Sequence, residues 1–360
     1  MAHTPDTPAG AGQMQFAAQR RKWPNELNVF IALIIIIVMF EVLGQLVMKQ
    51  SFLFDSSDRF DTIFNEQRLK IIILQVAIIG IIAIGVTQVI ILGGIDLSSG
   101  SIVGATAMIA MSFAQVETVN GAMNPKAMFG PALLDLPVIV PVMVGLACGM
   151  VAGLINGLLI AYTRIPPFIA TLGMLVSARG VAKWWSKGAP ISFPTDSYAA
   201  IGKGMMPVFI FLFVAVLFHL VMRYTVYGKH TYAIGSNEDA ARMSGIKVQR
   251  HKVLVYTIAA MLAALAALVL SSKNLTAQAG MGVVYELYAI AMAVIGGVSL
   301  SGGRGSIIGT VIGALIFGVI QSGFTFLRLD AYYQEMVLGA IIVGAVVLDQ
   351  WRQQRAGRRS

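Results

Sequence analysis

Long uninterrupted runs of apolar residues recur along the whole chain, separated by short polar segments. Most of them are close to the roughly 20 residues that a helix needs to cross about 30 Å of hydrocarbon. The runs are continuous rather than alternating, which favours helices over the strands of a barrel, and in lipid only these two structures satisfy their own backbone hydrogen bonds. The pattern predicts about ten spans, at residues 28–48, 71–92, 101–115, 137–162, 167–185, 206–223, 253–271, 285–299, 305–327 and 332–349.

The composition supports a membrane protein. Hydrophobic residues make up 57% and charged residues 12% of the chain, whereas a soluble domain carries about 25% charged residues. The polar loops are too short to bury an independent core, and the chain shows no phosphate-binding loop, metal-ligand set or nucleophile–base motif. The sequence therefore predicts an all-α polytopic membrane protein that is not an enzyme and holds no metal ion or other cofactor.

Basic residues set the predicted orientation. The formal net charge is +9, and in a polytopic chain basic residues mark cytoplasmic loops, so no nucleic-acid partner is expected. Arg20, Arg21 and Lys22 precede the first span, the tail after the last span is basic, and so is the longest loop, 224–252. An even number of spans puts both termini on one side. The positive-inside rule therefore places the termini and this loop in the cytoplasm.

This orientation divides the chain into three parts. Residues 1–27 form a polar cytoplasmic extension, residues 28–350 the transmembrane domain, and residues 351–360 a basic cytoplasmic tail. The first apolar run is too long for the core of a signal peptide and lacks a small-residue cleavage site, so we expect a retained span. Membrane lipid is the expected neighbour of the outward apolar faces.

A glycine-rich stretch with a carboxylate interrupts the apolar pattern at "GGIDLSSG", residues 93–100. The adjacent Gly93 and Gly94 favour the end of a helix, and Asp96 or Ser98 suits the N-cap of the next one. One interpretation is a tight capped turn between two spans. The other is a broken helix that lines a pathway, because non-helical backbone at membrane depth is tolerated only inside protein or beside a wet cavity. The two interpretations are compatible.

A second stretch repeats this frame about two hundred residues later. "GGVSLSGG" begins with Gly296 and Gly297 and has Ser299 in place of the acid. Paired glycine-interrupted segments in the two halves of a chain point to a transport pathway. The same glycines also suit close helix packing.

Three further polar side chains fall inside predicted spans: Asn156, Thr171 and Gln321. They are candidates for lining a pathway for neutral hydroxylated solutes. Each equally suits an interhelical hydrogen bond.

The third informative stretch is "NEDAARMSGI", in the basic loop 224–252. Asn237 is a natural N-cap, Glu238, Asp239, Ala240 and Ala241 favour a short helix, and Gly245 closes it. A short helix on the cytoplasmic face suits docking to another protein. The alternative is a helix that lies on the membrane surface, held by lipid headgroups.

The residues also match a family. The chain resembles the permease subunits of ribose-type ATP-binding-cassette (ABC) sugar importers. The resemblance rests on "GGIDLSSGSIVG", "IPPFIATLGML", "YGKHTYAIGSNEDAARMSGI", "YELYAIAMAVIGGVSLSGGRGS" and "GTVIGALIFGVIQSGF", which follow one another over residues 70–350.

The resemblance implies a ten-span permease in the bacterial inner membrane, working with a second copy of itself. It also implies a cytoplasmic ABC ATPase, which binds the ATP, and a periplasmic sugar-binding protein that delivers the solute. The segment from Asn237 to Gly245 is similar to the family's ATPase-docking signature, and the extension 1–27 is not part of the pattern. The expected solute is a sugar or cyclic polyol such as ribose, xylose or inositol.

The main rival is a secondary transporter coupled to protons or sodium ions. Such a transporter needs several acids arranged as a relay within its spans. Acids within or near the predicted spans are few and lie mostly at their ends. The sequence therefore favours the ATP-driven permease.

Overall fold

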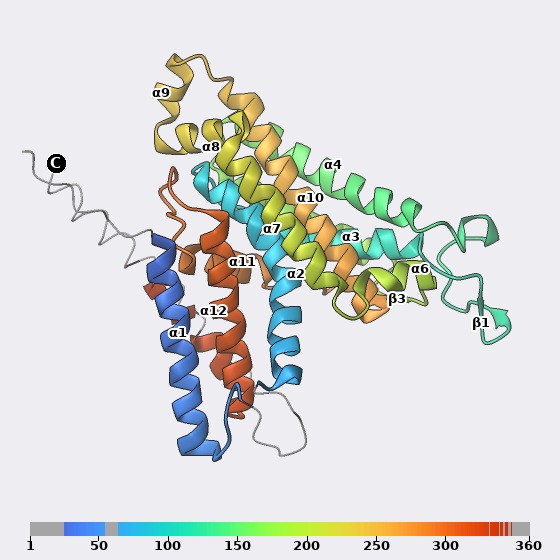
Figure 1. Ribbon diagram of the computed structural model, residues 1–360. Coiled ribbons are helices and arrows are strands. Elements are labelled where there is room, and N and C mark those ends of the chain that lie inside the picture. Colours follow the sequence, from blue (N-terminus) through green and yellow to red (C-terminus); the bar gives the residue numbers. More distant parts are fainter. Residues whose placement is uncertain are drawn as a thin grey trace, which may run out of the picture.

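The computed structural model describes residues 25–54 and 64–330, together with residues 332–337, 339, 340, 343, 344 and 347. Across these residues the protein is helical apart from connecting segments and two short pairs of strands (Figure 1). Six helices are long and apolar enough to cross a membrane within this part of the chain: α1 with its π-helical end, α2, α4, α7, α10 and α12.

In chain order the helices are α1 (Asn25–Leu43, continued by a π-helix at Gly44–Met48), α2 (Glu66–Ile91), α3 (Ser99–Ser112), α4 (Ile139–Thr163), α5 (Pro167–Trp185), α6 (Asp196–Ala199), α7 (Met206–Tyr224), α8 (Val226–Ser236), α9 (Glu238–Met243), α10 (Val248–Asn274), α11 (Tyr285–Ile295) and α12 (Ile307–Phe326). Short 3₁₀ turns occur at Pro131–Leu133 and Ala200–Gly202. Strand β1 (Thr118–Val119) pairs antiparallel with β2 (Ala122–Met123), and β3 (Ile191–Ser192) pairs antiparallel with β4 (Thr276–Ala277).

The predicted spans agree with these helices only in part. Two of them correspond to shorter apolar helices, α3 and α11, because a glycine-rich break shortens each one. The prediction of a span over 285–299 was therefore wrong beyond Ile295, where α11 ends. The inter-span segment 224–252 holds more helix than the single short one predicted there, since α8, α9 and the start of α10 all lie in it. Within the last predicted span, 332–349, every residue that the structure describes is helical (332–337, 339, 340, 343, 344 and 347), and the other residues of this span lie outside the described part of the chain.

Helices α2 and α10 form the centre of the molecule. In their most apolar stretches 67% of α2 and 72% of α10 is buried, against 22% of α1. Helix α10 reaches this burial with small side chains that let its neighbours come close: Ala259, Ala260, Ala263, Ala264, Ala266 and Ala267. Helices α1, α4 and α7 keep most of their apolar surface outward, so they form the periphery of the described part of the molecule.

A ladder of glycines joins α4 to this centre. Gly145, Gly149, Gly153 and Gly157 recur every four residues and therefore lie on one face of the helix. This face packs on α10, and a Cβ added at Gly153 would come 2.6 Å from the Thr257 Cα and 2.7 Å from the Tyr256 carbonyl oxygen. The spacing is the small-residue pattern by which membrane helices bring their backbones together.

Replacing Gly153 with alanine is expected to destabilise the protein. The new methyl group meets the backbone of α10, and overpacking of this kind costs about 1–3 kcal/mol. The matched control is Gly180→Ala on α5, where an added Cβ meets nothing within 4 Å. Thermal unfolding in detergent measures both variants. An equal or higher unfolding temperature for Gly153→Ala than for Gly180→Ala would contradict the close packing of α4 on α10.

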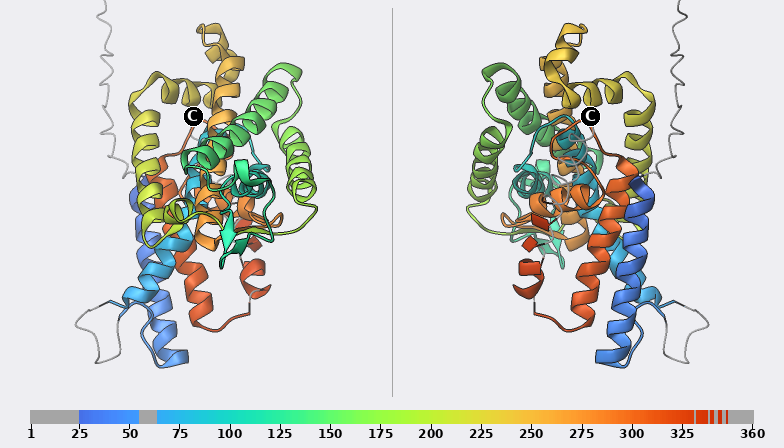
Figure 2. Two further views of the ribbon diagram at one scale, coloured as in Figure 1. Left: turned by 90° about the vertical axis from the view of Figure 1, so that its right-hand side faces the viewer. Right: turned by 90° about the vertical axis from the view of Figure 1, so that its left-hand side faces the viewer.

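Two ends of the molecule carry different elements. Helices α8 and α9 lie at one end in both Figure 1 and Figure 2. The starts of α1 and α12 lie beside α8, since Glu26, Ser306 and Tyr232 line one pocket. The contact between these starts is direct, since Ser306 Oγ donates a hydrogen bond of 2.9 Å to Glu26 Oε1. The strand pair β3–β4 and the segment at Gln115 lie at the other end, where Gln115 Nε2 donates to the Ser192 carbonyl over 2.9 Å. The start of α1 and the segment 224–252 thus share one end.

Candidate translocation and coupling site

The first break is the non-helical segment 92–98, which separates α2 from α3. The amide of Gly93 donates to the Ile90 carbonyl and that of Gly94 to the Val89 carbonyl, both over 2.9 Å. These two bonds form a Schellman motif. Gly93 has a φ of +92°, in the left-handed region that glycine adopts without strain. Gly94 leaves no room for a Cβ because the phenol oxygen of Tyr256 lies against it. The chain therefore turns sharply before it reaches Asp96.

The second break separates α11 from α12 and ends α11 in the same way. Gly297 donates to the Val294 carbonyl over 2.9 Å and Val298 to the Ala293 carbonyl over 3.0 Å, with Gly297 at a φ of +86°. Gly297 is thus the structural counterpart of Gly93. The helix end is therefore shifted by one residue relative to the shared sequence frame, in which Gly296 corresponds to Gly93 and Ser299 to Asp96.

Gly296 has a different role from Gly297. Its backbone is right-handed, with a φ of −66°, and a Cβ there would collide with the Gly309 carbonyl on α12. This glycine therefore lets α11 and α12 lie close together. Ser299 follows in the second break itself, where its amide donates to the Arg304 carbonyl over 3.0 Å.

Four predicted pathway residues meet in one buried cluster. Asp96 Oδ1 accepts hydrogen bonds from the amide (2.8 Å) and the hydroxyl (2.6 Å) of Ser98. Asn156 Nδ2, on α4, donates to the Ser98 hydroxyl over 2.9 Å. Thr171 Oγ1, on α5, lies 3.4 Å from the Ile95 carbonyl and donates within its own helix to Pro167. The first break is thereby tied to α4 and α5, and all four side chains are buried.

The prediction that Asp96 or Ser98 caps α3 was wrong. Ser98 occupies the N-cap position, but its side chain makes no cap hydrogen bond. Its hydroxyl instead donates backward to Asp96, because the carboxylate already accepts from the Ser98 amide and lies within reach. Helix α12 does have a side-chain cap, where Ser306 Oγ accepts from the Gly309 amide over 3.0 Å. Asp96 therefore shapes the break rather than the helix that follows.

The cluster keeps unused hydrogen-bonding capacity. Asp96 Oδ2, Asn156 Oδ1 and the hydroxyl of Tyr256 are buried, and no group among the described residues bonds them. Tyr256 lies on α10 and was missed by the sequence analysis, whose only available signal was a phenol within an alanine-rich span. Two acceptors and one donor–acceptor hydroxyl suit the hydroxyl groups of a neutral solute.

Arg179 and Glu286 lie against the start of α3. Arg179 Nη1, on α5, donates to the carbonyls of Ala279 (2.5 Å) and Met281 (2.9 Å). Glu286, on α11, places its carboxylate so close to Gly100 that a Cβ there would collide with it. The sequence analysis named neither residue as a site residue. Backbone carbonyls, rather than the Asp96 carboxylate, hold the Arg179 guanidinium.

Gln321 lies apart from this cluster. Its Oε1 accepts a hydrogen bond of 3.0 Å from Gln75 Nε2, beside an open recess of about 450 Å³ between α2, α10, α11 and α12. Gln75 is in the first half of α2 and Gly93 follows its end, so about 25 Å of helix separates them. Gln321 therefore belongs to the opposite half of the molecule from Asp96.

Helix α8 lies directly against both breaks. Gly235, near its end, leaves no room for a Cβ because the Ile91 carbonyl and the Gly303 amide press against it. A Cβ on Gly302 would come 2.7 Å from the Gly235 carbonyl oxygen and 3.0 Å from the Gly93 Cα. We call Gly93, Gly235 and Gly302 the glycine junction. Three backbones meet there at distances that only glycine permits.

Two hydrogen bonds fix the second break at this junction. The Gly303 amide donates to the Ile91 carbonyl over 2.8 Å. The Tyr232 hydroxyl, on α8, donates to the Gly305 carbonyl over 2.8 Å. Burial, together with the nearby Glu26 carboxylate, raises the pKa of Tyr232, so that its phenol stays protonated and keeps donating. The second break is thus bonded to α2 and to α8.

Helix α9 has the conformation that its sequence predicts. Asn237 caps it by accepting from the Ala240 amide over 2.9 Å. Gly245 closes it at a φ of +84°, and the Ile246 amide donates back to the Ala241 carbonyl over 3.1 Å. Gly245 and Ile246 thereby complete a third Schellman motif. Their role in docking remains a prediction.

The two faces of α9 differ. Ala241 is buried against the body of the protein, so it supports the helix and does not present a docking surface. Asp239, Ala240 and Met243 point outward, and Met243 is 85% exposed. Glu238 holds the helix in place through salt bridges to Arg242 (2.9 Å) and Lys252 (2.7 Å). Sequence reasoning missed Met243, although an exposed methionine is typical of adaptable binding surfaces.

Comparisons with known proteins show the family to which the chain belongs. Residues 68–346 match the family model described as "Branched-chain amino acid transport system / permease component". The ribose import permease protein RbsC of Bacillus subtilis is 40% identical over 283 residues, which cover 77% of this chain and 82% of the relative. RbsC of Escherichia coli K12 is 34% identical over 344 residues, covering 92% and 96% of the two chains.

A second kind of relative is similar over a comparable length. The galactose/methyl galactoside import permease protein MglC of Escherichia coli K12 is 33% identical over 306 residues, which cover 82% of this chain and 89% of the relative. No solved structure matches the chain. Because the family model spans most of the sequence and these relatives align over 82% to 96% of their own length, the chain belongs to the branched-chain amino acid transport system / permease component family.

Proposed function

We propose that this chain is the transmembrane subunit of an ATP-driven importer for a sugar or a cyclic polyol. The observation that carries the proposal is the glycine junction. There the segment α8–α9, outside the apolar spans, touches both breaks that flank the buried polar cluster. A movement that a partner imposes on α9 is therefore transmitted through α8 to the backbone of both breaks.

Family membership supports the transport role. The six apolar helices and the permease relatives make the chain a multi-pass protein of the inner membrane. It is a permease subunit and not an enzyme. Import by such a subunit implies an ATPase partner, which binds the ATP, and a periplasmic binding protein. Relatives named as ribose and galactose permeases support a sugar as the solute.

The finer architecture is part of the proposal. Helices α3, α5 and α11 and residues 332–349 bring the six apolar helices to ten spans. Both termini and the segment 224–252 then lie in the cytoplasm, as the distribution of basic residues indicates. A second copy of the chain completes the permease.

The buried cluster supports a neutral hydroxylated solute. Its unsatisfied hydrogen-bonding groups belong to Asp96, Asn156 and Tyr256. The cluster contains a carboxyl group but no cationic side chain. The cluster offers no cation to compensate a solute carboxylate or phosphate, whereas sugar hydroxyls both donate and accept hydrogen bonds. We therefore place part of the solute pathway at the first break, and we assign Gly93, Gly94, Asp96, Ser98, Asn156 and Thr171 to it. We assign the second break, with Gly296, Gly297 and Ser299, to the same pathway, because it contacts the first break at the glycine junction.

Reconstitution tests the proposed function. Proteoliposomes that contain the chain and its ATPase are expected to take up radiolabelled ribose or galactose only with ATP on the ATPase side and binding protein on the opposite side. Ionophores that collapse proton and sodium gradients should leave this uptake unchanged. Uptake by the chain alone, driven by an ion gradient, would instead establish the secondary transporter.

A further inference from the structure

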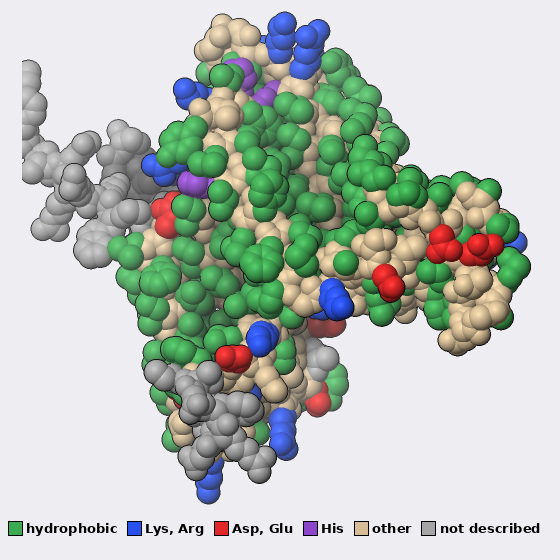
Figure 3. Space-filling view, turned by 45° about the vertical axis from the view of Figure 1, so that its right-hand side comes forward, with side chains coloured by type: hydrophobic (Ala, Val, Ile, Leu, Met, Phe, Trp, Pro, Cys, Tyr) green, Lys and Arg blue, Asp and Glu red, His purple; other side chains and the backbone are tan. Residues whose placement is uncertain are grey.

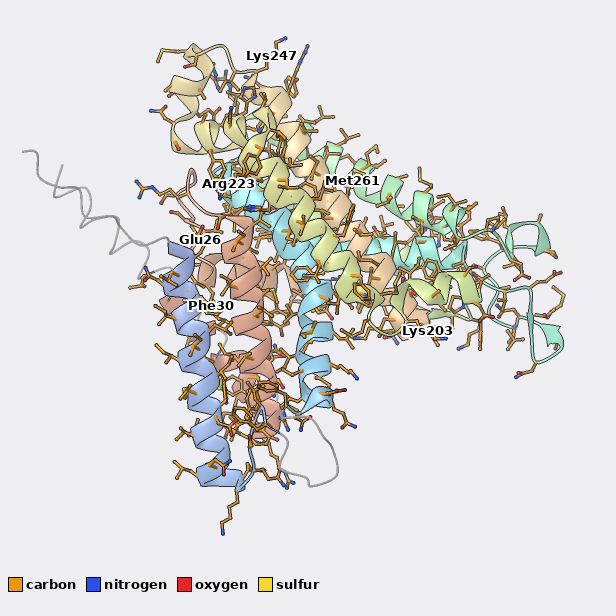
Figure 4. All side chains as sticks on the ribbon, in the orientation of Figure 1. Glu26, Phe30, Lys203, Arg223, Lys247 and Met261 are labelled. Carbon is orange, nitrogen blue, oxygen red and sulfur yellow. The ribbon has the colours of Figure 1, made fainter. Side chains whose placement is uncertain are left out.

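An open pocket of about 440 Å³ lies where three apolar helices end. The start of α1, the end of α7, the start of α12 and helix α8 enclose it. Its lining includes Glu26, His219, Arg223, Lys229, Tyr232 and Ile308. Figure 4 labels Glu26 at the start of α1 and Arg223 at the end of α7, and both residues line this pocket.

The pocket has two uncompensated cations. Among the described residues, no carboxylate lies within 4.0 Å of the Arg223 guanidinium or the Lys229 ammonium group. The one acid in the lining, Glu26, already accepts a hydrogen bond from Ser306. His219 lies one helical turn before Arg223 and adds a third nitrogen donor. The lining therefore favours an anion with several acceptor oxygens.

The position of the pocket indicates where this anion comes from. Three candidate spans end at the pocket, so it lies at the level where hydrocarbon gives way to headgroups. Below it, exposed apolar side chains continue along both walls: Phe30 and Ile34 on α1, and Phe213, Leu217 and Leu220 on α7. Figure 3 shows basic, acidic and histidine side chains gathered at one edge of a largely hydrophobic face. Charge above apolar surface matches a lipid, and not a free anion.

We propose that this pocket binds the phosphate headgroup of an anionic phospholipid. Arg223 and Lys229 contact the phosphate oxygens, His219 donates a further hydrogen bond, and the acyl chains follow the apolar faces of α1 and α7. Helix α8 forms one wall of the pocket and, through Gly235, contacts both breaks. A bound lipid would therefore stabilise α8 in its place against them. The proposal concerns the chain itself and does not depend on its solute or on an ATPase.

The test compares lipids on the purified chain in detergent. Native mass spectrometry and thermal unfolding are measured with phosphatidylglycerol, with phosphatidylcholine and with inorganic phosphate. The wild type is expected to bind phosphatidylglycerol and to unfold at a higher temperature in its presence, whereas phosphatidylcholine and phosphate have little effect. The double variant Arg223→Gln, Lys229→Gln should bind phosphatidylglycerol at least about tenfold more weakly, since each basic residue at a membrane surface contributes about 1 kcal/mol.

Matched variants separate this site from general attraction to a basic surface. Lys203→Gln and Lys247→Gln each remove an exposed charge outside the pocket (both residues are labelled in Figure 4) and should bind the lipid as the wild type does. Arg223→Lys keeps the charge and should retain most of the binding. The proposal is overturned if the double variant binds phosphatidylglycerol normally, or if Lys247→Gln loses as much binding. Equal stabilisation by inorganic phosphate would also overturn it, because the ligand would then be a free anion.

Discussion

Replacing Ala240 with tryptophan is expected to abolish stimulation of the partner ATPase while leaving the folded permease intact. Ala240 is exposed on the outward face of α9, between the exposed side chains of Asp239 and Met243. A bulky indole there blocks close approach of a partner, but it meets no neighbouring helix of this chain. ATP hydrolysis by the reconstituted complex should fall at least about tenfold, as for loss of a central interface contact worth more than about 1.4 kcal/mol.

The burial pattern supplies the controls for this experiment. Ala241→Trp is not diagnostic, because Ala241 is only 4% exposed and packs in a cluster with Ile234 and Val248. We expect that variant to lower the unfolding temperature, whereas Ala240→Trp should not. Met243→Ala should weaken coupling without destabilising the helix. The membrane-surface alternative predicts that Ala240→Trp is tolerated and that neutralising Lys247 and Arg250 abolishes activity. Full ATPase stimulation in Ala240→Trp would remove α9 as the docking element.

Replacing Gly235 with alanine is expected to uncouple ATP hydrolysis from transport. A Cβ at this position collides with the Ile91 carbonyl at the end of α2 and approaches the Gly303 amide to 2.7 Å. Both contacts are backbone atoms, which cannot rotate away, so α8 has to move off the two breaks. The complex should still hydrolyse ATP, since the outer face of α9 is unchanged. Solute uptake per ATP hydrolysed should fall at least about tenfold, and a factor of ten corresponds to about 1.4 kcal/mol of lost coupling free energy.

Two comparisons distinguish uncoupling from simple loss of stability. Gly149→Ala introduces a similar collision with α10, where a Cβ would come 2.7 Å from the Ala260 carbonyl oxygen and meets neither Tyr256 nor the breaks, so it should lower the unfolding temperature but preserve uptake per ATP in the folded fraction. Gly180→Ala, which meets nothing within 4 Å, should match the wild type in both measurements. If Gly235→Ala and Gly149→Ala reduce uptake per ATP equally, the glycine junction has no special role in coupling.

Local signals in the sequence determined most helices and several of their ends. Apolar runs of sufficient length force helices, because the backbone must bond itself in lipid. Helix ends follow from neighbouring residues alone. For this reason α9 begins after Asn237 and is closed by Gly245 as predicted, and α2 ends before Gly93. Where two glycines are adjacent, as at Gly296 and Gly297, the residues do not reveal which one takes the left-handed conformation. Packing against Gly309 decided that.

The tertiary structure decided which distant residues meet. The contacts of Tyr256 with Gly94, of Glu286 with Gly100 and of Gly235 with Ile91 join segments more than a hundred residues apart. No pattern within one helix encodes such pairs, because each depends on how closely two backbones approach. The same holds for burial. Ala240 and Ala241 are the same residue type, yet Ala240 is exposed and Ala241 is buried against the core. The sequence by itself determined a helical permease with two broken segments; packing alone determined that both breaks meet the helix beside the proposed docking face.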